Sequence, residues 1–330
     1  MIIEDVAFPA GVHCETTTLG ALLRHEGLEL SEPMLFGLGE GLGFVYWDAK
    51  YLDFPFLGGR TKPFTITRNA ADRLGLELRV QETASPRKAW QNVTAALAAG
   101  RPVGLQLDSY HLDHFTTKVH FGGHFAALRG YDDTHAHLVD TAQQGGLVTT
   151  TLASLALARG ERGPMTARNR SYTVAVPADR PSAADAVREA VRSTARTFLT
   201  PPIANLGHSG IDKAARQVVR WLDRSADPAH DLPLAATLME RGGTGGGLFR
   251  VLFRDFLVEA AEIADDDVLR EGGARYAEIA PLWTEVATLV ETAGNTGEQA
   301  HLTRASEVLT DLAERERRAM RLLAGEGCSP

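Results

Sequence analysis

The spacing of apolar residues divides the chain into a mixed first part and a helical second part. In the first part, Leu19, Leu22 and Leu23 fall on one face of a helix that we expect over residues 14–26. Two further helices are predicted at 67–75 and 86–99, and a glycine-rich loop at 37–43. Short apolar runs bounded by turn residues predict strands at 44–47, 76–81, 102–109, 124–130, 136–140 and 171–176.

The second part has a helical period almost throughout. Residues 183–198 form an amphipathic pattern that Ser182 caps and Pro201 ends. Similar patterns predict helices at 211–223, 232–241, 247–264, 267–293 with a break at Pro281, and 298–324. The change of pattern lies in the proline-containing stretch 177–182. We therefore predict an α+β domain over residues 1–178 and an all-α domain over residues 179–330.

Cys14 lies at the expected N-terminus of the first helix, within the sequence His13-Cys14-Glu15. The unpaired N–H groups and partial positive charge at a helix N-terminus favour a thiolate over a thiol. The alternative is that Cys14 is a small buried apolar residue, which is a common situation for a free cysteine. Position alone leaves both interpretations open.

A second segment favours the interpretation of Cys14 as a nucleophile. His124 begins one predicted strand, and the next strand ends on Asp140 after a turn. Two strands joined by a turn run antiparallel, so we expect His124 and Asp140 at the same edge of the sheet. A thiol, a histidine that takes or holds its proton and a carboxylate that orients the histidine make a catalytic triad. We therefore predict that Cys14, His124 and Asp140 are catalytic.

Composition and charge exclude several classes of protein. The 330 residues include 44% hydrophobic and 23% charged residues, which is ordinary for a soluble globular protein. The formal net charge of −8 argues against nucleic acid as a partner, because phosphate binding needs a basic face. An acidic protein partner would need a local basic patch, for which the candidates are Arg60 with Lys62, Arg159 with Arg162, and Arg168 with Arg170.

The expected location is the cytoplasm. The N-terminus has no basic flank or apolar core of a secretory signal, and no apolar stretch approaches the length of a membrane span. Cys14 and Cys328 are the two cysteines, and they do not make a disulfide framework. We therefore expect a protein of a reducing compartment that has no membrane partner.

Two further patterns raise the question of a metal or phosphate site. His111, His114, His120 and His124 are close in sequence, but structural zinc sites usually include a close pair of cysteines, and none lies nearby. We therefore expect no metal, with a histidine cluster that has an open coordination position as the alternative. The stretch Gly242–Gly247 lacks the ending of a phosphate-binding loop, so we interpret it as a turn between helices or a point of close contact.

Three residues are candidates for contact with a substrate. Asp108 and Tyr110 follow a predicted buried strand, and we expect them to line a cleft between the domains, where pockets often form. The alternative for Asp108 is that it caps a turn. Arg250 follows the glycine-rich stretch and is the third candidate.

The order of these motifs resembles two families. Cysteine on the first helix, histidine on a later strand and aspartate at the end of the next strand resemble the papain-like peptidases that process bacteriocin leaders. The chain is more similar to the butirosin-type aminoglycoside acyltransferase family. The stretches that carry this resemblance are His13-Cys14, 30–44, 100–110, Gly123-His124-Phe125, Gly130-Tyr131-Asp132, Val139-Asp140 and 242–250.

The resemblance to the acyltransferase family implies a papain-like fold, a helical C-terminal domain and a role in antibiotic biosynthesis. Cys14 would accept an acyl group from the thioester of an acyl carrier protein, and the amine of a small polar acceptor would then attack the acyl-enzyme. Exchange between thioesters is nearly balanced in energy, so no cofactor is expected. The sequence departs from the pattern at Glu15, where a small residue is expected, and it lacks Gln or Asn just before Cys14. Backbone N–H groups are therefore the expected oxyanion donors.

Two alternatives stay open at this point. A cysteine hydrolase, whether a peptidase, an amidase or a thioesterase, would use the same triad with water as the acceptor. A papain-like binding module without activity is the other alternative, and an intact triad speaks against it. Exclusion of water and the shape of the acceptor site separate transfer from hydrolysis, and the sequence shows neither.

Overall fold

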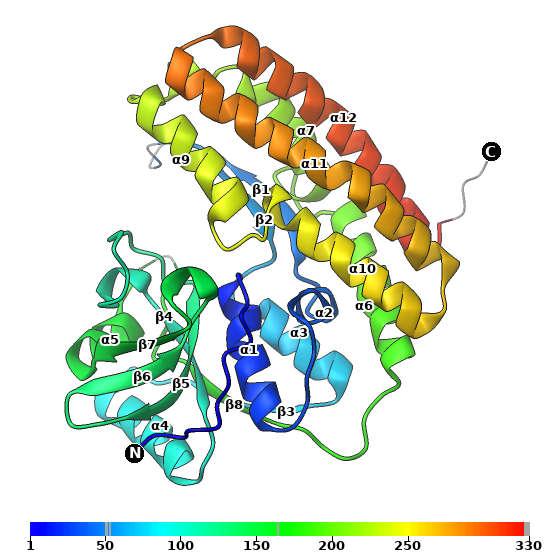
Figure 1. Ribbon diagram of the computed structural model, residues 1–330. Coiled ribbons are helices and arrows are strands. Elements are labelled where there is room, and N and C mark those ends of the chain that lie inside the picture. Colours follow the sequence, from blue (N-terminus) through cyan, green and yellow to red (C-terminus); the bar gives the residue numbers. More distant parts are fainter. Residues whose placement is uncertain (50–51, 53, 164, 327–330) are drawn as a thin grey trace. The chain divides into compact units, whose positions relative to one another are not determined.

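The computed structural model describes residues 1–49, 52, 54–163 and 165–326. It divides the chain into two compact units, one of residues 1–35 and 63–181 and the other of residues 36–62 and 182 onward. Figure 1 shows the order of the elements along the chain. In the part of the chain that the structure describes, no helix is both long enough and apolar enough to cross a membrane.

The first unit is built on a six-stranded antiparallel sheet. Its order is β3-β8-β4-β5-β6-β7, and every neighbouring pair runs antiparallel. The strands are β3 (Glu77–Gln81), β4 (Val103–Leu107), β5 (His124–Tyr131), β6 (His135–Val139), β7 (Leu147–Thr151) and β8 (Ser171–Ala175). In the β5–β6 hairpin Ala127 pairs with Val139, so the start of β5 and the residue after β6 meet at one edge of the sheet.

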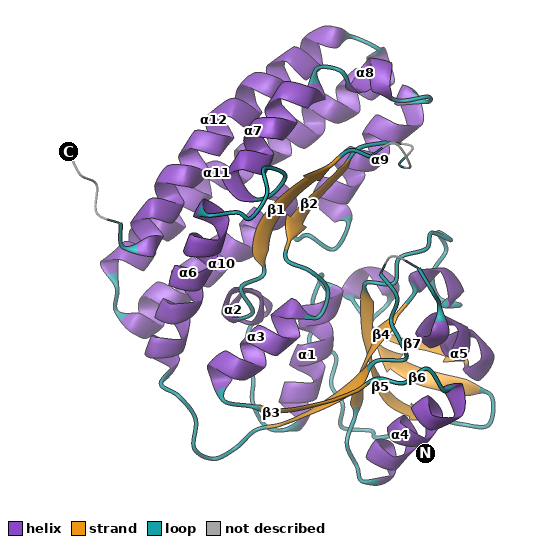
Figure 2. Cartoon of the chain, turned by 180° about the vertical axis from the view of Figure 1, so that it is seen from behind, coloured by secondary structure: helices purple, strands orange, loops and turns teal. Residues whose placement is uncertain are grey.

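Helices cover both faces of this sheet (Figures 1 and 2). On one face, α4 (Pro86–Ala98) and α5 (Leu152–Gly160) pack on an apolar core formed with β4, β5 and β6. Central residues of this core are Leu97, Leu105, Leu128, Leu138 and Leu155, which are almost fully buried. On the other face, α1 (Cys14–His25) contacts β5 and α3 (Thr65–Leu74). The helix that begins with Cys14 is therefore fixed directly on the strand that begins with His124.

The second unit is a helical bundle with one β-hairpin. Its long helices α11 (Asp267–Thr296) and α12 (Gln299–Ala324) pack along each other, and α9 (Pro228–Arg241) and α10 (Arg250–Ala264) contact α11. The helices α6 (Ala183–Leu199) and α7 (Gly207–Val218) contact α12, and the short α8 (Trp221–Arg224) contacts α9. Turn 242–247 joins α9 to the 3-10 turn Gly247–Phe249 and has positive φ at Gly243, Gly245, Gly246 and Gly247, so its interpretation as a turn between helices is confirmed.

The hairpin explains why residues 36–62 group with the helices. Strands β1 (Leu42–Trp47) and β2 (Phe56–Arg60) pair antiparallel, and β1 lies against α7 (Figure 2). The ring of Phe44 lies 5.4 Å from that of Trp283 on α11. The helix before the hairpin, α2 (Glu32–Leu38), brings Gly37 so close to Phe256 that a Cβ at this position would lie 2.0 Å from the Phe256 ring. No local pattern in 36–62 indicates these contacts.

The α+β class and the antiparallel sheet are confirmed, and the succession of Cys helix, His strand and Asp strand is consistent with a papain-like arrangement. Three local predictions were wrong. Part of the expected loop 37–43 is helix and strand, and the helix expected over 211–223 is interrupted near Arg220, which lets Trp221 bury next to Phe54. The break expected at Pro281 is absent from α11, because buried residues on both sides of it, including Tyr276 and Trp283, offset the lost hydrogen bond, which costs about 3 kcal/mol.

Candidate active site

Cys14 occupies the first position of α1, at the end of a segment that a carboxylate holds. The Glu32 side chain accepts hydrogen bonds from the amides of Val12 (2.9 Å) and His13 (2.8 Å) and from the Thr16 hydroxyl (2.9 Å). Gly11 is required here, because a Cβ would lie 2.2 Å from the Thr17 hydroxyl. The cysteine is a free thiol of intermediate exposure. Glu32 therefore fixes the chain just before the candidate nucleophile.

Glu15 follows the candidate nucleophile where a small residue is expected, and it has a clear structural role. Its carboxylate is fully buried and accepts hydrogen bonds from the amides of Phe64 (3.1 Å) and Thr67 (2.9 Å) and from the Thr67 hydroxyl (3.1 Å). These groups belong to the N-terminus of α3, whose N-cap residue Phe64 has a φ of 70° and no capping side chain of its own. Glu15 thus caps α3 and joins it to α1.

His124 and Asp140 meet at the sheet edge where the hairpin places them. The His124 Nε2 atom lies 2.9 Å from Asp140 Oδ2, and the Thr141 amide donates to Asp140 Oδ1 at 2.7 Å. Both side chains are almost fully buried. Burial opposes the carboxylate, but the charge of His124 and the hydrogen bonds from His114, His124 and Thr141 outweigh it and lower the pKa of Asp140. Asp140 is therefore a buried anion bonded to the imidazole.

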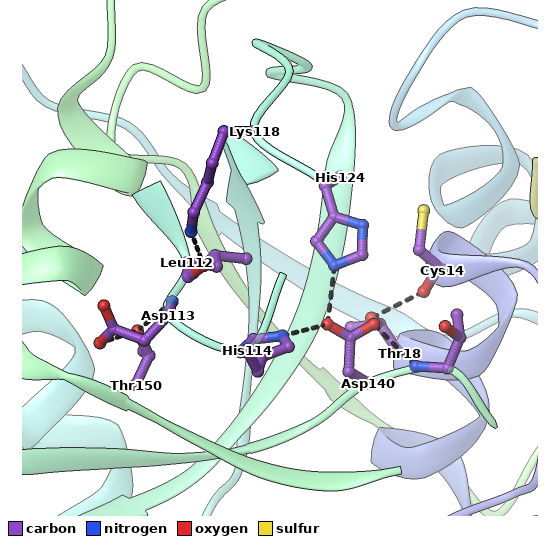
Figure 3. A network of polar contacts seen from close by, with 10 residues as sticks. Cys14, Thr18, Leu112, Asp113, His114, Lys118, His124, Asp140 and Thr150 are labelled. Carbon is purple, nitrogen blue, oxygen red and sulfur yellow. Dashed lines mark hydrogen bonds and ion pairs between the residues drawn. The ribbon is translucent and has the colours of Figure 1, made fainter. Parts of the chain in front are cut away.

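The other nitrogen of the His124 ring faces Cys14. Figure 3 shows the sulfur beside the edge of the imidazole, on the side away from Asp140. Burial disfavours the imidazolium, but the Asp140 charge, the Asp140 hydrogen bond and a hydrogen bond with Cys14 outweigh it, and together they raise the pKa of His124 well above its usual range. The Cys14 sulfur therefore lies next to a buried imidazolium, which is the kind of environment in which cysteine nucleophiles occur.

A second histidine also bonds to the orienting carboxylate. His114 Nε2 lies 2.9 Å from Asp140 Oδ2, the same oxygen that bonds to His124 (Figure 3). The next residue, Phe115, packs its ring edge to face against His124 with centroids 5.0 Å apart. The His114 Nδ1 atom is buried and has no hydrogen-bond partner among the described residues, so the protonated nitrogen of a neutral His114 is Nε2. The segment before β5 thus fixes both members of the His124–Asp140 pair.

The Cys14 amide is a candidate donor for an oxyanion. The Val12 and His13 amides are already bonded to Glu32, so they are not free to bind a substrate oxygen. The Cys14 amide lies in the first turn of α1, where a helix leaves its N–H groups unpaired, and it has no acceptor in the described contacts. We therefore expect the backbone N–H groups that bind an oxyanion to lie in the first turn of α1.

The three predicted substrate contacts have other partners. Asp108 is buried and accepts hydrogen bonds from the Tyr110 amide (2.9 Å) and the Phe121 amide (3.2 Å), which corresponds to the turn-capping alternative. Tyr110 is partly exposed and stacks on His120 with ring centroids 4.0 Å apart. None of these contacts supports a substrate role for Asp108.

Arg250 is fully buried in the helical unit. Its guanidinium donates to both oxygens of Glu316, at 2.9 and 3.0 Å, and to the Leu248 carbonyl at 2.8 Å. It also lies over the Trp283 ring, 4.6 Å from the centroid, and the Trp283 indole donates to Glu316 at 2.6 Å. These contacts give Arg250 a role in packing, and they leave none of its three nitrogens directed at a substrate.

The basic pairs offered for an acidic partner are partly used inside the protein. Arg159 is buried and donates to the Ala89 carbonyl, and burial lowers its pKa to about 10. Arg170 bonds to Glu82 and Gln106 and lies over the Phe64 ring. The pairs that contain these two residues therefore do not form simple surface patches. Cys328 lies outside the residues that the structure describes.

Glu32 and His114 are parts of the site that the sequence did not single out for it. His114 appears in the sequence only as a member of a histidine-rich stretch, and Glu32 precedes a proline without any motif of its own. Their partners lie 26 and up to 20 residues away, so no short-range pattern pairs them.

Two families match the chain. Residues 13–141 match the N-terminal region of butirosin biosynthesis protein H. Residues 153–323 match a domain of unknown function, DUF4872. The first match begins just before Cys14 and ends just after Asp140, so it contains all three predicted triad residues, and the second covers α6 to α12 almost completely. A comparison with individually curated proteins found no match.

Proposed function

The chain belongs to the butirosin biosynthesis protein H family, and from this premise we propose that it is an enzyme of antibiotic biosynthesis that transfers an acyl group through Cys14. The observation that carries the proposal is the contact of Cys14 and Asp140 with opposite sides of the His124 ring. Acyl transfer through a thiol needs a nucleophile, a proton carrier and a group that orients the carrier. All three belong to the region that matches the family.

The first half of the reaction is the acylation of Cys14. The thiolate attacks the carbonyl carbon of an acyl thioester, and the carbonyl oxygen becomes an oxyanion near the Cys14 amide. As the tetrahedral intermediate collapses, the carbon–sulfur bond to the donor breaks and the imidazolium of His124 gives its proton to the departing thiolate. The products are an acyl-Cys14 thioester, a free donor thiol and a neutral His124. The raised pKa of His124 supports this sequence, because the proton needed by the leaving thiolate is already on the ring.

The second half is the transfer to an amine. The amine nitrogen attacks the acyl-Cys14 carbonyl, His124 takes a proton from that nitrogen, and the Cys14 thiolate leaves. An amide is formed and the thiolate–imidazolium pair is restored. The atoms and charges of the two half-reactions therefore balance without a cofactor. Asp140 stays ionised and stabilises the imidazolium in each half. The carrier-protein donor and the small polar acceptor are part of this proposal.

The test is intact-protein mass spectrometry after incubation with a panel of acyl-pantetheine thioesters. We expect an adduct of the acyl mass, which maps to Cys14 by peptide analysis and decays faster when a small amine acceptor is added. We expect Cys14→Ser to abolish this thioester adduct and the matched thiol variant Cys328→Ser to retain it.

The same experiment separates transfer from hydrolysis. An adduct that decays to free acid at a rate independent of any amine would assign the triad to a hydrolase. An adduct on Cys328, or no adduct with any thioester in folded protein, would refute acyl transfer through Cys14.

A further inference from the structure

Three potential metal ligands, none of them a residue of the predicted triad, converge on the surface of the first unit. His111, His120 and Glu161 each offer one ligand atom, and these atoms all lie within 4.8 Å of one another. His111 ends the 3-10 turn Ser109–His111, His120 lies shortly before β5, and Glu161 follows α5. The sequence does not bring Glu161 into the histidine cluster, because it lies 50 residues from His111.

We propose that His111, His120 and Glu161 bind a divalent transition-metal ion of the zinc type. Two imidazole nitrogens and a carboxylate oxygen are a ligand set that zinc accepts, with a solvent molecule in the fourth position. Ligands about 2.1 Å from a tetrahedral zinc ion lie about 3.4 Å from one another. In the structure His111 Nε2 lies 2.7 Å from Glu161 Oε2, and no two of the three ligand atoms are more than 4.8 Å apart. The separation required for zinc lies between these two values. Small side-chain rotations therefore suffice for binding.

Contacts behind the ligands orient His120. The buried Asp108 carboxylate lies 3.2 Å from His120 Nδ1, so Nδ1 carries the proton and Nε2 keeps its lone pair for a metal. A carboxylate that holds the second nitrogen of a histidine is the usual support of a metal ligand. Tyr110 stacks on the same ring at an interplanar angle of 12°. Asp108 and Tyr110 thus act as positioning residues for this ligand.

The metal ion would connect the two ends of the segment 111–120, whose residues contact the predicted triad. His111 and His120 lie at the two ends of a stretch that contains His114 and Phe115, and these two residues contact Asp140 and His124. An ion bound at both ends would join the stretch to the end of α5 through Glu161. The ion is expected to order this stretch and takes no part in the acyl-transfer steps, so the inference does not depend on the proposed function.

The test measures zinc binding in tag-free protein in which both thiols are removed, as Cys14→Ser with Cys328→Ser. Equilibrium dialysis against buffered Zn²⁺, followed by elemental analysis, is expected to give about one ion per chain. His111→Gln, His120→Gln and Glu161→Gln should each weaken binding by at least about tenfold. The matched control is His137→Gln, since His137 pairs with Asp132 at 3.0 Å on the surface outside the cluster, and it should leave binding unchanged.

A second measurement covers the case in which the double cysteine variant does not fold. Wild-type protein with both thiols alkylated is titrated with Co²⁺, whose visible absorption reports nitrogen and oxygen ligation, and amide exchange of residues 112–120 is followed with and without Zn²⁺. We expect a saturable cobalt spectrum that His111→Gln removes, and slower exchange with zinc. Binding that is equally tight in all three ligand variants, or an absence of saturable binding in folded protein, overturns the proposal.

Discussion

Replacing Asp140 with Asn removes the charge that holds the imidazolium while keeping nearly the same shape. In the native protein Asp140 Oδ2 bonds to both His124 and His114, and Oδ1 accepts the Thr141 amide. An Asn side chain has one carbonyl oxygen for these three donors and no negative charge. The imidazolium of His124 therefore loses its buried counterion, and its pKa must fall from the raised value of the native protein.

The size of the fall follows from the hydrogen bond that is lost. A hydrogen bond to a charged group contributes about 1.5–3 kcal/mol, and one pKa unit corresponds to about 1.4 kcal/mol. The pKa of His124 should therefore decrease by about one to two units in Asp140→Asn. Burial of the ring, which favours the neutral form, acts in the same direction once the counterion is gone.

The assay is a histidine NMR titration of protein labelled with ¹⁵N in its imidazole rings, in which signals of His124 are assigned by their loss in His124→Gln. Cys14→Ser serves as the background, because it removes the thiol that forms a hydrogen bond with His124. Asp132→Asn is the matched control, since Asp132 accepts from His137 on the surface. Coincident His124 titrations in the Asp140→Asn and parent proteins, or an equal shift in Asp132→Asn, would refute the reasoning.

The pKa shifts of His124 and Asp140 also predict how the free energy of unfolding depends on pH. The pKa of His124 is raised in the folded protein. Its contribution to the free energy of unfolding is therefore complete below its pKa in the unfolded chain, about 6.5, and is lost as the pH rises through its pKa in the folded protein. The folded pKa of Asp140 is lowered, so its contribution is present above its unfolded pKa of about 3.9 and is lost as the pH falls through the folded value. Urea unfolding should show the largest difference between wild type and Asp140→Asn between about pH 4 and pH 6.5.

Two further predictions test residues outside the triad. His114→Leu should slow single-turnover acylation of Cys14 by about tenfold to a hundredfold, because Asp140 loses one of its hydrogen-bond donors. His114→Gln keeps an N–H group and should restore much of the rate. Equal rates for both variants would contradict a role of His114 through hydrogen bonding. Arg250→Ala should lower the free energy of unfolding by about 3–5 kcal/mol in urea titrations, because it leaves the Glu316 carboxylate buried without its partner; a loss below about 1 kcal/mol would contradict the assignment of Arg250 to packing.

Local signals in the sequence account for the parts of the site that were predicted. The apolar spacing of Leu19, Leu22 and Leu23 fixes α1, and with it the place of Cys14 at a helix N-terminus. The turn between β5 and β6 fixes an antiparallel pair, so His124 and Asp140 had to reach one edge. Both inferences use contacts between residues that are close in the sequence.

The remaining parts depend on contacts that no local pattern contains. Glu15 caps a helix that begins about 50 residues later, and Arg250 pairs with Glu316, 66 residues away. The capping role of Glu15 therefore becomes visible only in the folded structure. The position of Arg250 after a glycine-rich turn predicts a contact with substrate, whereas contacts with α11 and α12 bury its side chain in the helical unit.

The contacts around Cys14 also identify which groups set the electrostatic potential at its sulfur. The N-terminus of α1 carries a partial positive charge, but the Glu32 carboxylate already accepts hydrogen bonds from the Val12 and His13 amides just before the helix. A second carboxylate, Glu15, lies in the first turn of the same helix. Both anions reduce the positive potential that the helix N-terminus offers to the sulfur. In the proposed mechanism the positive charge beside Cys14 is therefore the imidazolium of His124, and the buried Asp140 carboxylate is the group that stabilises it.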